Sequence, residues 1–157
     1  MKEMRVHCVD PGPAREAHLA LLLLADESEQ QVRGYFQEGM LFVAELDGAD
    51  VGIVLAIPLG PGEVELKAVA VDQRQHNRGL GTRMLALVLD DLKRRGFSRV
   101  VVGTGNSGIG QLAFYQKAGF RLLKIERDFF STARGYPDDI EENGIPLRDM
   151  VWLDQMI

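Results

Sequence analysis

The stretch EVELKAVAVDQRQHNRGLGTRML, which spans residues 63–85, contains the transition that decides the fold. Apolar and charged side chains alternate from Glu63 to Val71, as in a β-strand with one buried face. From Leu80 onward the apolar residues recur at helical spacing, and Gly96 is a typical residue after the last turn of a helix. The stretch therefore predicts a strand over 63–71, a glycine-containing turn and a helix over 80–95.

The alternation in the predicted strand assigns its side chains to two faces. One face is expected to hold Val64, Leu66, Ala68 and Ala70. The other face is expected to hold Glu65, Lys67, Val69 and Val71.

The segments on both sides of this stretch predict further strands and helices. Apolar runs bounded by turn residues predict strands over 4–9, 40–46, 50–59, 99–103, 120–129 and 148–156. Helical spacing predicts helices over 14–24, 27–37 and 109–118. The sequence DGAD at 47–50 predicts a hairpin, whereas the later elements alternate as βαβ units. Residues 1–157 are therefore predicted to form a single three-layer α/β domain, with a central mixed, mostly antiparallel sheet flanked by helices.

The composition limits the classes of function. The 157 residues carry a net charge of −5, which disfavours binding to nucleic acids. The longest apolar run, residues 19–25, is too short to span a bilayer, and the N-terminus lacks the features of a signal peptide. Cys8 is the one cysteine, so no disulfide forms within the chain, which is compatible with a reducing cytosol. We therefore expect a cytoplasmic protein without nucleic-acid or membrane partners, and the sequence leaves a homodimer open.

Gly79 and Gly81 lie between a basic loop and the predicted helix. The first N–H groups of a helix lack internal partners and the helix dipole is positive there, so the turn suits a phosphate. A P-loop would need a lysine directly after its second glycine, and a dinucleotide fingerprint would need a third glycine, where Met84 stands. Both classes are disfavoured, and the spacing alone leaves open whether the turn binds phosphate or only connects two elements.

The turn and the strand before it resemble the acyl-CoA-binding motif of the GNAT family of N-acetyltransferases. That motif is Gln/Arg-x-x-Gly-x-Gly/Ala after a strand that ends in Ala-Val. Gly79 and Gly81 match its glycines, and Val69 and Val71 match the strand end. His76 stands where the family has its leading Gln or Arg.

A second stretch, TGNSGIGQLAFYQKAGF at residues 104–120, resembles the later motif of the same family, Asn…Leu-Tyr-x-x-x-Gly-Phe. Tyr115, Gly119 and Phe120 match in spacing. Phe114 replaces the usual leucine, and Asn106 lies two residues further upstream of the tyrosine than the family's asparagine. Two motifs in the family's order are more specific than either one, and the resemblance extends loosely over residues 41–128.

The resemblance implies an enzyme with the acyl-CoA N-acyltransferase fold that uses acetyl-CoA as cosubstrate. It also implies a backbone N–H near Val69 that stabilises the charged intermediate. The implied cofactor-binding residues are Val69, Ala70, Val71, His76, Asn77, Arg78, Gly79, Leu80, Gly81, Thr82 and Asn106.

Acetyl transfer to an amine requires a base for the amine and an acid for the departing thiolate. Tyr115 matches the family's tyrosine, and a phenol with a pKa near 10 is protonated at neutral pH, so Tyr115 is the predicted general acid. Glu65 is the predicted base, because the resembling families often have a strand glutamate about this far before the Ala-Val end. Glu63 is the alternative, and either glutamate could instead pair with Lys67 or face solvent. The three histidines lack ligand spacing, so we expect no metal.

The stretch before the last predicted strand combines acidic and aromatic residues. The acidic residues are Asp128, Asp138, Asp139, Glu141 and Glu142. The aromatic residues are Phe129, Phe130, Tyr136 and Trp152. In the resembling family, early helices and late loops form the acceptor cleft, so this stretch predicts that the acceptor is a primary amine on a small cationic molecule. A plain solvated loop is equally consistent with the composition.

Two other functions remain open on the sequence. One is acetyl transfer to a protein lysine or N-terminus, and the other is a non-catalytic acyl-CoA-binding regulatory module. Tyr115 favours an enzyme over the module.

Overall fold

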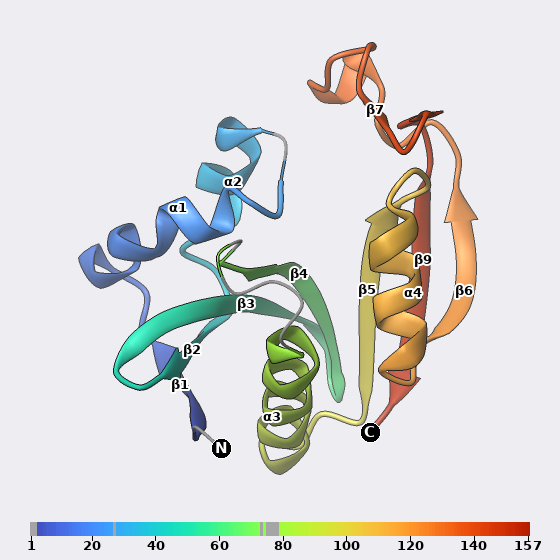
Figure 1. Cartoon of the computed structure of the whole chain (residues 1–157). Coiled ribbons are helices and arrows are strands. Elements are labelled where there is room, and N and C mark those ends of the chain that lie inside the picture. Colours follow the sequence, from blue (N-terminus) through green and yellow to red (C-terminus); the bar gives the residue numbers. More distant parts are fainter. Residues whose placement is uncertain (1–2, 27, 73, 75–78) are drawn as a thin grey trace.

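In the computed structural model, which describes residues 3–26, 28–72, 74 and 79–157, a seven-stranded sheet runs through the molecule (Figure 1). Its strand order is β1-β2-β3-β4-β5-β9-β6. The strands are β1 Met4–Val9, β2 Met40–Leu46, β3 Ala49–Gly60, β4 Glu63–Val71, β5 Arg99–Gly105, β6 Arg121–Glu126 and β9 Met150–Met156. β4 and β5 are parallel, and the other neighbours are antiparallel. The prediction of a mixed, mostly antiparallel sheet is confirmed.

Helices lie on both faces of this sheet, which confirms the three predicted layers (Figure 1). One face carries η1 Pro13–His18, α1 Leu19–Leu22 and α2 Glu29–Tyr35. The other face carries α3 Leu80–Arg94 and α4 Ile109–Lys117. The segment between β6 and β9 contains the short helix η3 Thr132–Arg134 and a small hairpin of β7 Glu141–Glu142 and β8 Ile145–Pro146.

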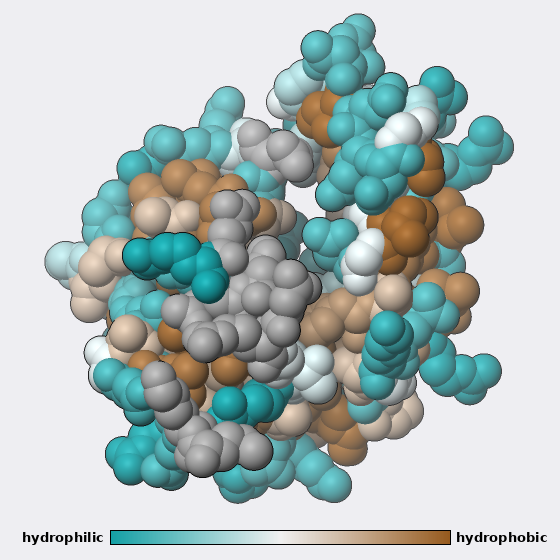
Figure 2. Space-filling model, in the orientation of Figure 1, coloured by the Kyte–Doolittle hydropathy of each residue, from teal (hydrophilic) through white to brown (hydrophobic). Residues whose placement is uncertain are grey.

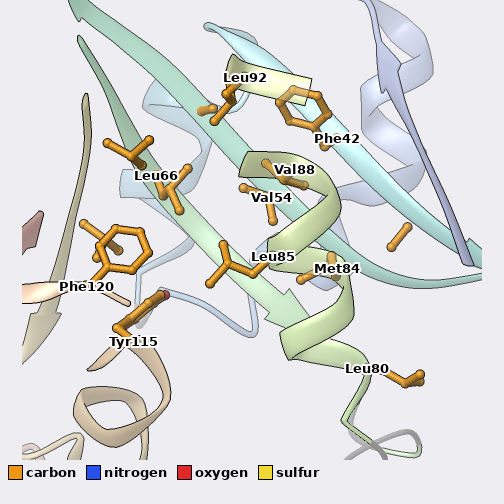
Figure 3. Close-up of a cluster of buried hydrophobic side chains, with 14 of the residues drawn as sticks. Phe42, Val54, Leu66, Leu80, Met84, Leu85, Val88, Leu92, Tyr115 and Phe120 are labelled. Atoms are coloured by element: carbon orange, nitrogen blue, oxygen red, sulfur yellow. The ribbon is translucent and has the colours of Figure 1, made fainter. Parts of the chain in front are cut away.

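Each helical layer buries its own apolar cluster against the sheet. On the α3 side, Met84, Val88 and Leu92 belong to one apolar cluster with Leu66 of β4 (Figure 3), and each of these three α3 residues is at most 1% exposed. The second cluster, on the α1 and α2 side, includes the fully buried Leu22 of α1. Because truncating such a residue to alanine costs about 2–5 kcal/mol, the two clusters together hold β4 firmly from both sides.

A β-bulge interrupts β4 and corrects the predicted faces of that strand. Leu55 of β3 pairs with Ala68 and the next residue, Ala56, pairs with Leu66, so Lys67 is an extra residue in β4. A bulge of this kind shifts the alternation of side chains by one position. Leu66 therefore belongs to the α3-side cluster, whereas Ala68 belongs to the α2-side cluster.

Glu65 consequently does not share a face with Val69 and Val71, and that prediction is wrong. Glu65 precedes the bulge, whereas the two valines follow it and pack against the α3-side cluster. The alternating pattern continues without interruption through Lys67, so the sequence carries no local signal for the bulge.

The predicted helix over 14–24 is divided into η1 and α1. Arg15 of η1 is 1% exposed, and its guanidinium donates to the carbonyls of Val9, Phe36, Glu38 and Gly39 at 2.6–3.0 Å. A guanidinium has five donors in a planar fork, so it can satisfy several carbonyls that converge on it. These bonds attach η1 to the ends of β1 and α2, and they hold the Arg15 side chain inside the protein.

Candidate active site

β4 and β5 separate halfway along their length, and this separation creates the site. Their parallel pairing ends at Leu66 and Val102, although β4 continues to Val71 and β5 to Gly105 (Figure 1). Within the described ranges, the part of β4 beyond Leu66 has no strand partner on the side of β5. Backbone N–H and C=O groups on this side are therefore directed into the gap, where a ligand can pair with them.

The gap is a cleft of about 270 Å³. Figure 2 shows a hollow between the two halves of the molecule at this position. Side chains from both halves line the cleft, among them Asp26, Glu65, Lys67, Tyr115, Phe130 and Tyr136. Residues that lie far apart in the sequence thus share one cavity.

Glycine at position 103 gives the β5 wall of the cleft its shape. A Cβ atom on Gly103 would lie 2.9 Å from both Met150 Sδ and Trp152 Cζ3, closer than real Cβ atoms come to other atoms. The side chains of Met150 and Trp152 on β9 therefore pack directly over the backbone of β5.

Tyr115 projects from α4 toward β4 (Figure 3). It is 6% exposed, and the rings of Phe114 and Phe120 contact it edge-on with centroid distances of 5.1 and 5.7 Å. Burial raises the pKa of Tyr115 above its ordinary value, so the phenol stays protonated and can donate a hydrogen bond to a ligand in the cleft.

Glu65 lines the cleft, whereas Glu63 is paired elsewhere. Glu63 accepts a hydrogen bond from Arg99 Nη1 at 3.0 Å, and Arg99 also bonds Asp154 at 2.9 Å. Burial raises the pKa of Glu65, and the nearby Lys67 partly opposes this effect. A carboxylate with a raised pKa is a stronger base than one in water. Of the two glutamates, Glu65 is the one that lines the cleft.

Asp26, Tyr35 and Lys67 form a polar cluster on the α2 side that the sequence did not reveal. The Tyr35 hydroxyl donates to Asp26 Oδ2 at 3.0 Å, and Lys67 Nζ lies 5.2 Å from the centroid of the Tyr35 ring. Asp26 and Lys67 both line the cleft. Asp26 lies in the connection between α1 and α2. This connection belongs to the region of early helices where the acceptor cleft was expected, but the sequence did not single out Asp26 within it.

Aromatic residues from the C-terminal segment form the opposite wall. The centroid of Phe130 lies 5.0 Å from that of Phe129 and 5.1 Å from that of Tyr136, and all three residues line the cleft. Of the five acidic residues predicted at this rim, Glu142 is the one that lines the cleft. Gln31 Nε2 of α2 donates to the carbonyl of Arg134 at 3.1 Å, and this bond joins the two walls.

The glycine turn begins α3 close to the end of β4, since a Cβ atom on Gly81 would lie 3.6 Å from Val71 Cγ2. Gly79 is the N-cap residue of α3 with a φ of 71°, and the described residues provide neither a side-chain cap nor an acidic residue in the first turn. A Cβ atom on Gly81 would lie 3.3 Å from Phe114 Cε1, so this glycine allows α3 to pack closely on α4. Leu80 is 4% exposed, and its side chain belongs to the α3-side cluster. The first turn therefore offers backbone N–H groups to an anion, together with the exposed side chain of Thr82.

The side chain of Asn106 holds the segment before β9 in place. Its Oδ1 accepts from the backbone N–H groups of Arg148 and Asp149 at 2.8 and 2.9 Å, and its Nδ2 donates to the Pro146 carbonyl at 3.1 Å. Asn106 does not line the cleft. Among the predicted cofactor-binding residues, His76, Asn77 and Arg78 lie outside the described residues.

Comparisons with known proteins identify the family. The family model described as "Acetyltransferase (GNAT) family" matches residues 13–120. The chain belongs to the GNAT acetyltransferase family. The resemblance noted in the two motifs is thereby confirmed.

Relatives of this GNAT protein match most of its length. A protein of Bacillus subtilis (strain 168), named as an uncharacterized N-acetyltransferase, YvbK, is 39% identical over 133 residues, 85% of this chain and 84% of that protein. An IAA acetyltransferase from Bacillus cereus ATCC 14579 has a TM-score of 0.87 at 36% identity, covering 99% of this chain and 100% of that chain. A GNAT family acetyltransferase from Elizabethkingia anophelis with acetyl-CoA bound has a TM-score of 0.85 at 34% identity, covering 98% of both chains.

This GNAT chain is accordingly an acetyl-CoA-dependent N-acetyltransferase. Acetyl-CoA is its cosubstrate, and the free edge of β4 and the uncapped start of α3 suit the pantetheine amides and the pyrophosphate of that molecule. No group of three or more metal-ligating side chains occurs in the part of the chain that the structure describes. None of the helices among the described residues is long and apolar enough to cross a membrane.

The two glycines with positive φ at the ends of α3 provide a test of the turn. Gly79 has a φ of 71° and Gly96 a φ of 99°, and a Cβ atom would meet nothing within 4 Å at either position. An L-residue in this conformation costs about 1–2 kcal/mol, so Gly79→Ala and Gly96→Ala should lower the melting temperature similarly. Only Gly79→Ala should also weaken CoA binding, by about tenfold in calorimetry, because it disturbs the N–H groups of the turn. Equal CoA affinities of the two variants would contradict a role of Gly79 in binding.

Proposed function

We propose that this GNAT enzyme transfers the acetyl group of acetyl-CoA to a primary amine of a small cationic molecule, with Tyr115 as general acid and Glu65 as general base. The observation that carries the proposal is the arrangement of these two side chains. Tyr115 belongs to the α3-side cluster and Glu65 precedes the bulge, so they line one cleft from opposite faces of the sheet. A reacting group in the gap between β4 and β5 is accessible to both.

The cofactor half of the cleft positions the thioester. The proposed contacts are β4 from Val69 to Val71, which continues beyond the last residue paired with β5, and the first turn of α3 from Gly79 to Thr82. An N–H group of β4 near Val69, directed at the carbonyl oxygen, would stabilise the negative charge that develops there during attack. Fixing both reactants in one cleft also lowers the entropic cost of their encounter.

In the proposed reaction, Glu65 accepts a proton and Tyr115 donates one. Glu65 accepts a proton from the ammonium form of the acceptor, directly or through a water molecule, and the free amine nitrogen forms a bond to the carbonyl carbon. When the carbon–sulfur bond breaks, the Tyr115 hydroxyl donates its proton to the thiolate. The nitrogen of the tetrahedral intermediate loses its second proton, through water, to the Tyr115 phenolate, and Glu65 releases its proton to solvent. The products are the acetamide, CoA thiol and one proton in solution.

The acceptor half of the cleft has a negative balance of charge. The acidic Asp26, Glu65 and Glu142 line the cleft together with one basic residue, Lys67, and the rings of Phe130 and Tyr136 line it as well. Carboxylates next to aromatic faces attract organic cations. The bond between Gln31 and Arg134 joins the two walls of the cleft and favours a small acceptor over a folded protein.

Acetylation of a protein N-terminus is the second candidate. A [Ribosomal protein bS18]-alanine N-acetyltransferase of Salmonella typhimurium is 33% identical over 78 residues, 50% of this chain and 53% of that protein. The cytoplasmic location expected from the single cysteine would suit either acceptor, and it stays a prediction.

Replacing the proposed acid tests the role of the Tyr115 hydroxyl. Tyr115→Phe should lower kcat by about 10²-fold or more, because the thiolate then leaves without a proton donor, and should leave the Kd for CoA nearly unchanged. Thiol release across a panel of amines gives kcat, and calorimetry gives Kd. An unchanged kcat in Tyr115→Phe would exclude Tyr115 as the general acid.

Replacing the proposed base has a matched control two residues away. Glu65→Gln should lower kcat by about 10²-fold, whereas Glu63→Gln, which affects the pair with Arg99, should have little effect. The wild-type kcat/KM should rise with pH through the raised pKa of Glu65, because the carboxylate form is active, and Glu65→Gln should lose that step. Equal losses in both variants would exclude Glu65 as the base.

Removing one charge at the rim tests the class of acceptor. Asp26→Asn should raise KM for a diamine by about tenfold and leave KM for an uncharged hydroxylamine-type acceptor unchanged, because only the ionic attraction is lost. Tyr35→Phe removes the hydroxyl that bonds Asp26 but keeps the carboxylate, so it serves as the control. An unchanged KM in Asp26→Asn would contradict a cationic acceptor.

A further inference from the structure

β6 forms one outer edge of the large sheet and is unusually apolar for an exposed strand. Its Leu122, Leu123 and Ile125 are 61%, 42% and 64% exposed, respectively. Figure 2 shows hydrophobic residues along the right margin of the molecule, where Figure 1 places α4 and β6. Soluble proteins usually protect an edge strand from pairing with other chains, so an apolar edge that is open on both faces suggests a covering partner.

A bulge in β6 determines which of its side chains share a face. Leu122 pairs with Leu153 of β9, but Lys124 pairs with the adjacent Trp152, so Leu123 is an extra residue. Because residues directly opposite one another lie on the same face, Leu122 and Ile125 face the α4 side with Leu153 and Val151.

The charged ends of β6 lie together on the other face. Arg121 is opposite Asp154, and Glu126 is opposite Met150. Asp154 and Met150 are separated by an even number of positions in β9, so they lie on the same face of the sheet, and so do the β6 residues opposite them. The hydrogen bond of 3.2 Å from Trp152 Nε1 to Glu126 Oε1 agrees with this assignment. Arg121 makes no ion pair with the described residues of its own chain, whereas the other carboxylate oxygen of Glu126, Oε2, accepts from Arg134 Nη2 at 3.1 Å.

We infer that β6 pairs antiparallel with β6 of a second copy of this chain, about a two-fold axis between Leu123 and Lys124. In this register Arg121 lies opposite the partner's Glu126 on one face, and Leu122 lies opposite the partner's Ile125 on the other. Each contact occurs twice, as a two-fold interface requires. The two sheets become continuous, and the apolar side chains of both copies cover one another.

No neighbouring register satisfies charge and face together. A shift of one residue in one direction places Arg121 opposite the partner's Ile125, on different faces. A shift in the other direction places Lys124 opposite the partner's Lys124, and like charges opposite each other are unfavourable. The order R-L-L-K-I-E, combined with the bulge, is therefore complementary to itself in one register.

The cleft stays open in this dimer. β9 lies between β6 and β5, so the second copy adds to the edge of the sheet away from the gap between β4 and β5. The inference therefore stands apart from the proposed function and does not depend on the acceptor.

Sedimentation of the full chain tests whether the dimer exists. The wild-type protein should sediment with twice the mass of the chain at micromolar concentrations. Ile125→Lys should shift it to the monomer, whereas Leu59→Lys should not, although Leu59 is 54% exposed on β3. Both variants should keep the thiol-release activity. A wild-type monomer at all concentrations, or a dimer that persists in Ile125→Lys, would overturn the inference.

A cysteine pair tests the register itself. In a Cys8→Ser background, which removes the native thiol, the double variant Leu122→Cys/Ile125→Cys should form a linked dimer under mild oxidation. Opposite residues of an antiparallel pair lie within reach of a disulfide, whereas each single variant places its two cysteines several residues apart. Equal cross-linking of the single and double variants, or none in the double variant, would exclude this register.

Discussion

The end of the pairing between β4 and β5 is the constraint on which the other features of the site depend. Two parallel strands that stay paired satisfy each other's backbone groups and leave no room for a ligand. Here the hydrogen bonds stop at Leu66 and Val102, and both strands continue under the restraint of two apolar clusters. The unpaired edge would be unfavourable in a dry core, and a ligand with amide groups of its own resolves the conflict.

The bulge at Lys67 explains why Glu65 and Tyr115 approach the cleft from different faces of the sheet. Without the extra residue, Glu65 and Val69 would share a face, and the carboxylate would lie among the side chains that pack under α3. With it, the same strand presents a carboxylate toward α2 and a valine toward α3. Lys67 itself is free to turn toward the Tyr35 ring and moderate the pKa of Glu65.

The sequence predicted most of the secondary structure because the periodicity of β1, β4 and α3 is strong and their ends carry turn residues. It also indicated Tyr115, since a family motif records the position. It failed where non-local contacts decide: the bulge depends on the pairing with β3, and the burial of Arg15 depends on carbonyls that converge from β1 and α2. Asp26 was missed for the same reason, because its relation to the cleft exists only once α2 packs beside β4.

The hydrogen bond between Gln31 and the Arg134 carbonyl closes the mouth of the cleft across 103 positions of sequence. It is exposed to water, and a neutral bond of this kind contributes about 1 kcal/mol, close to thermal energy. The mouth can therefore widen by local fluctuations of η3 without any movement of the sheet.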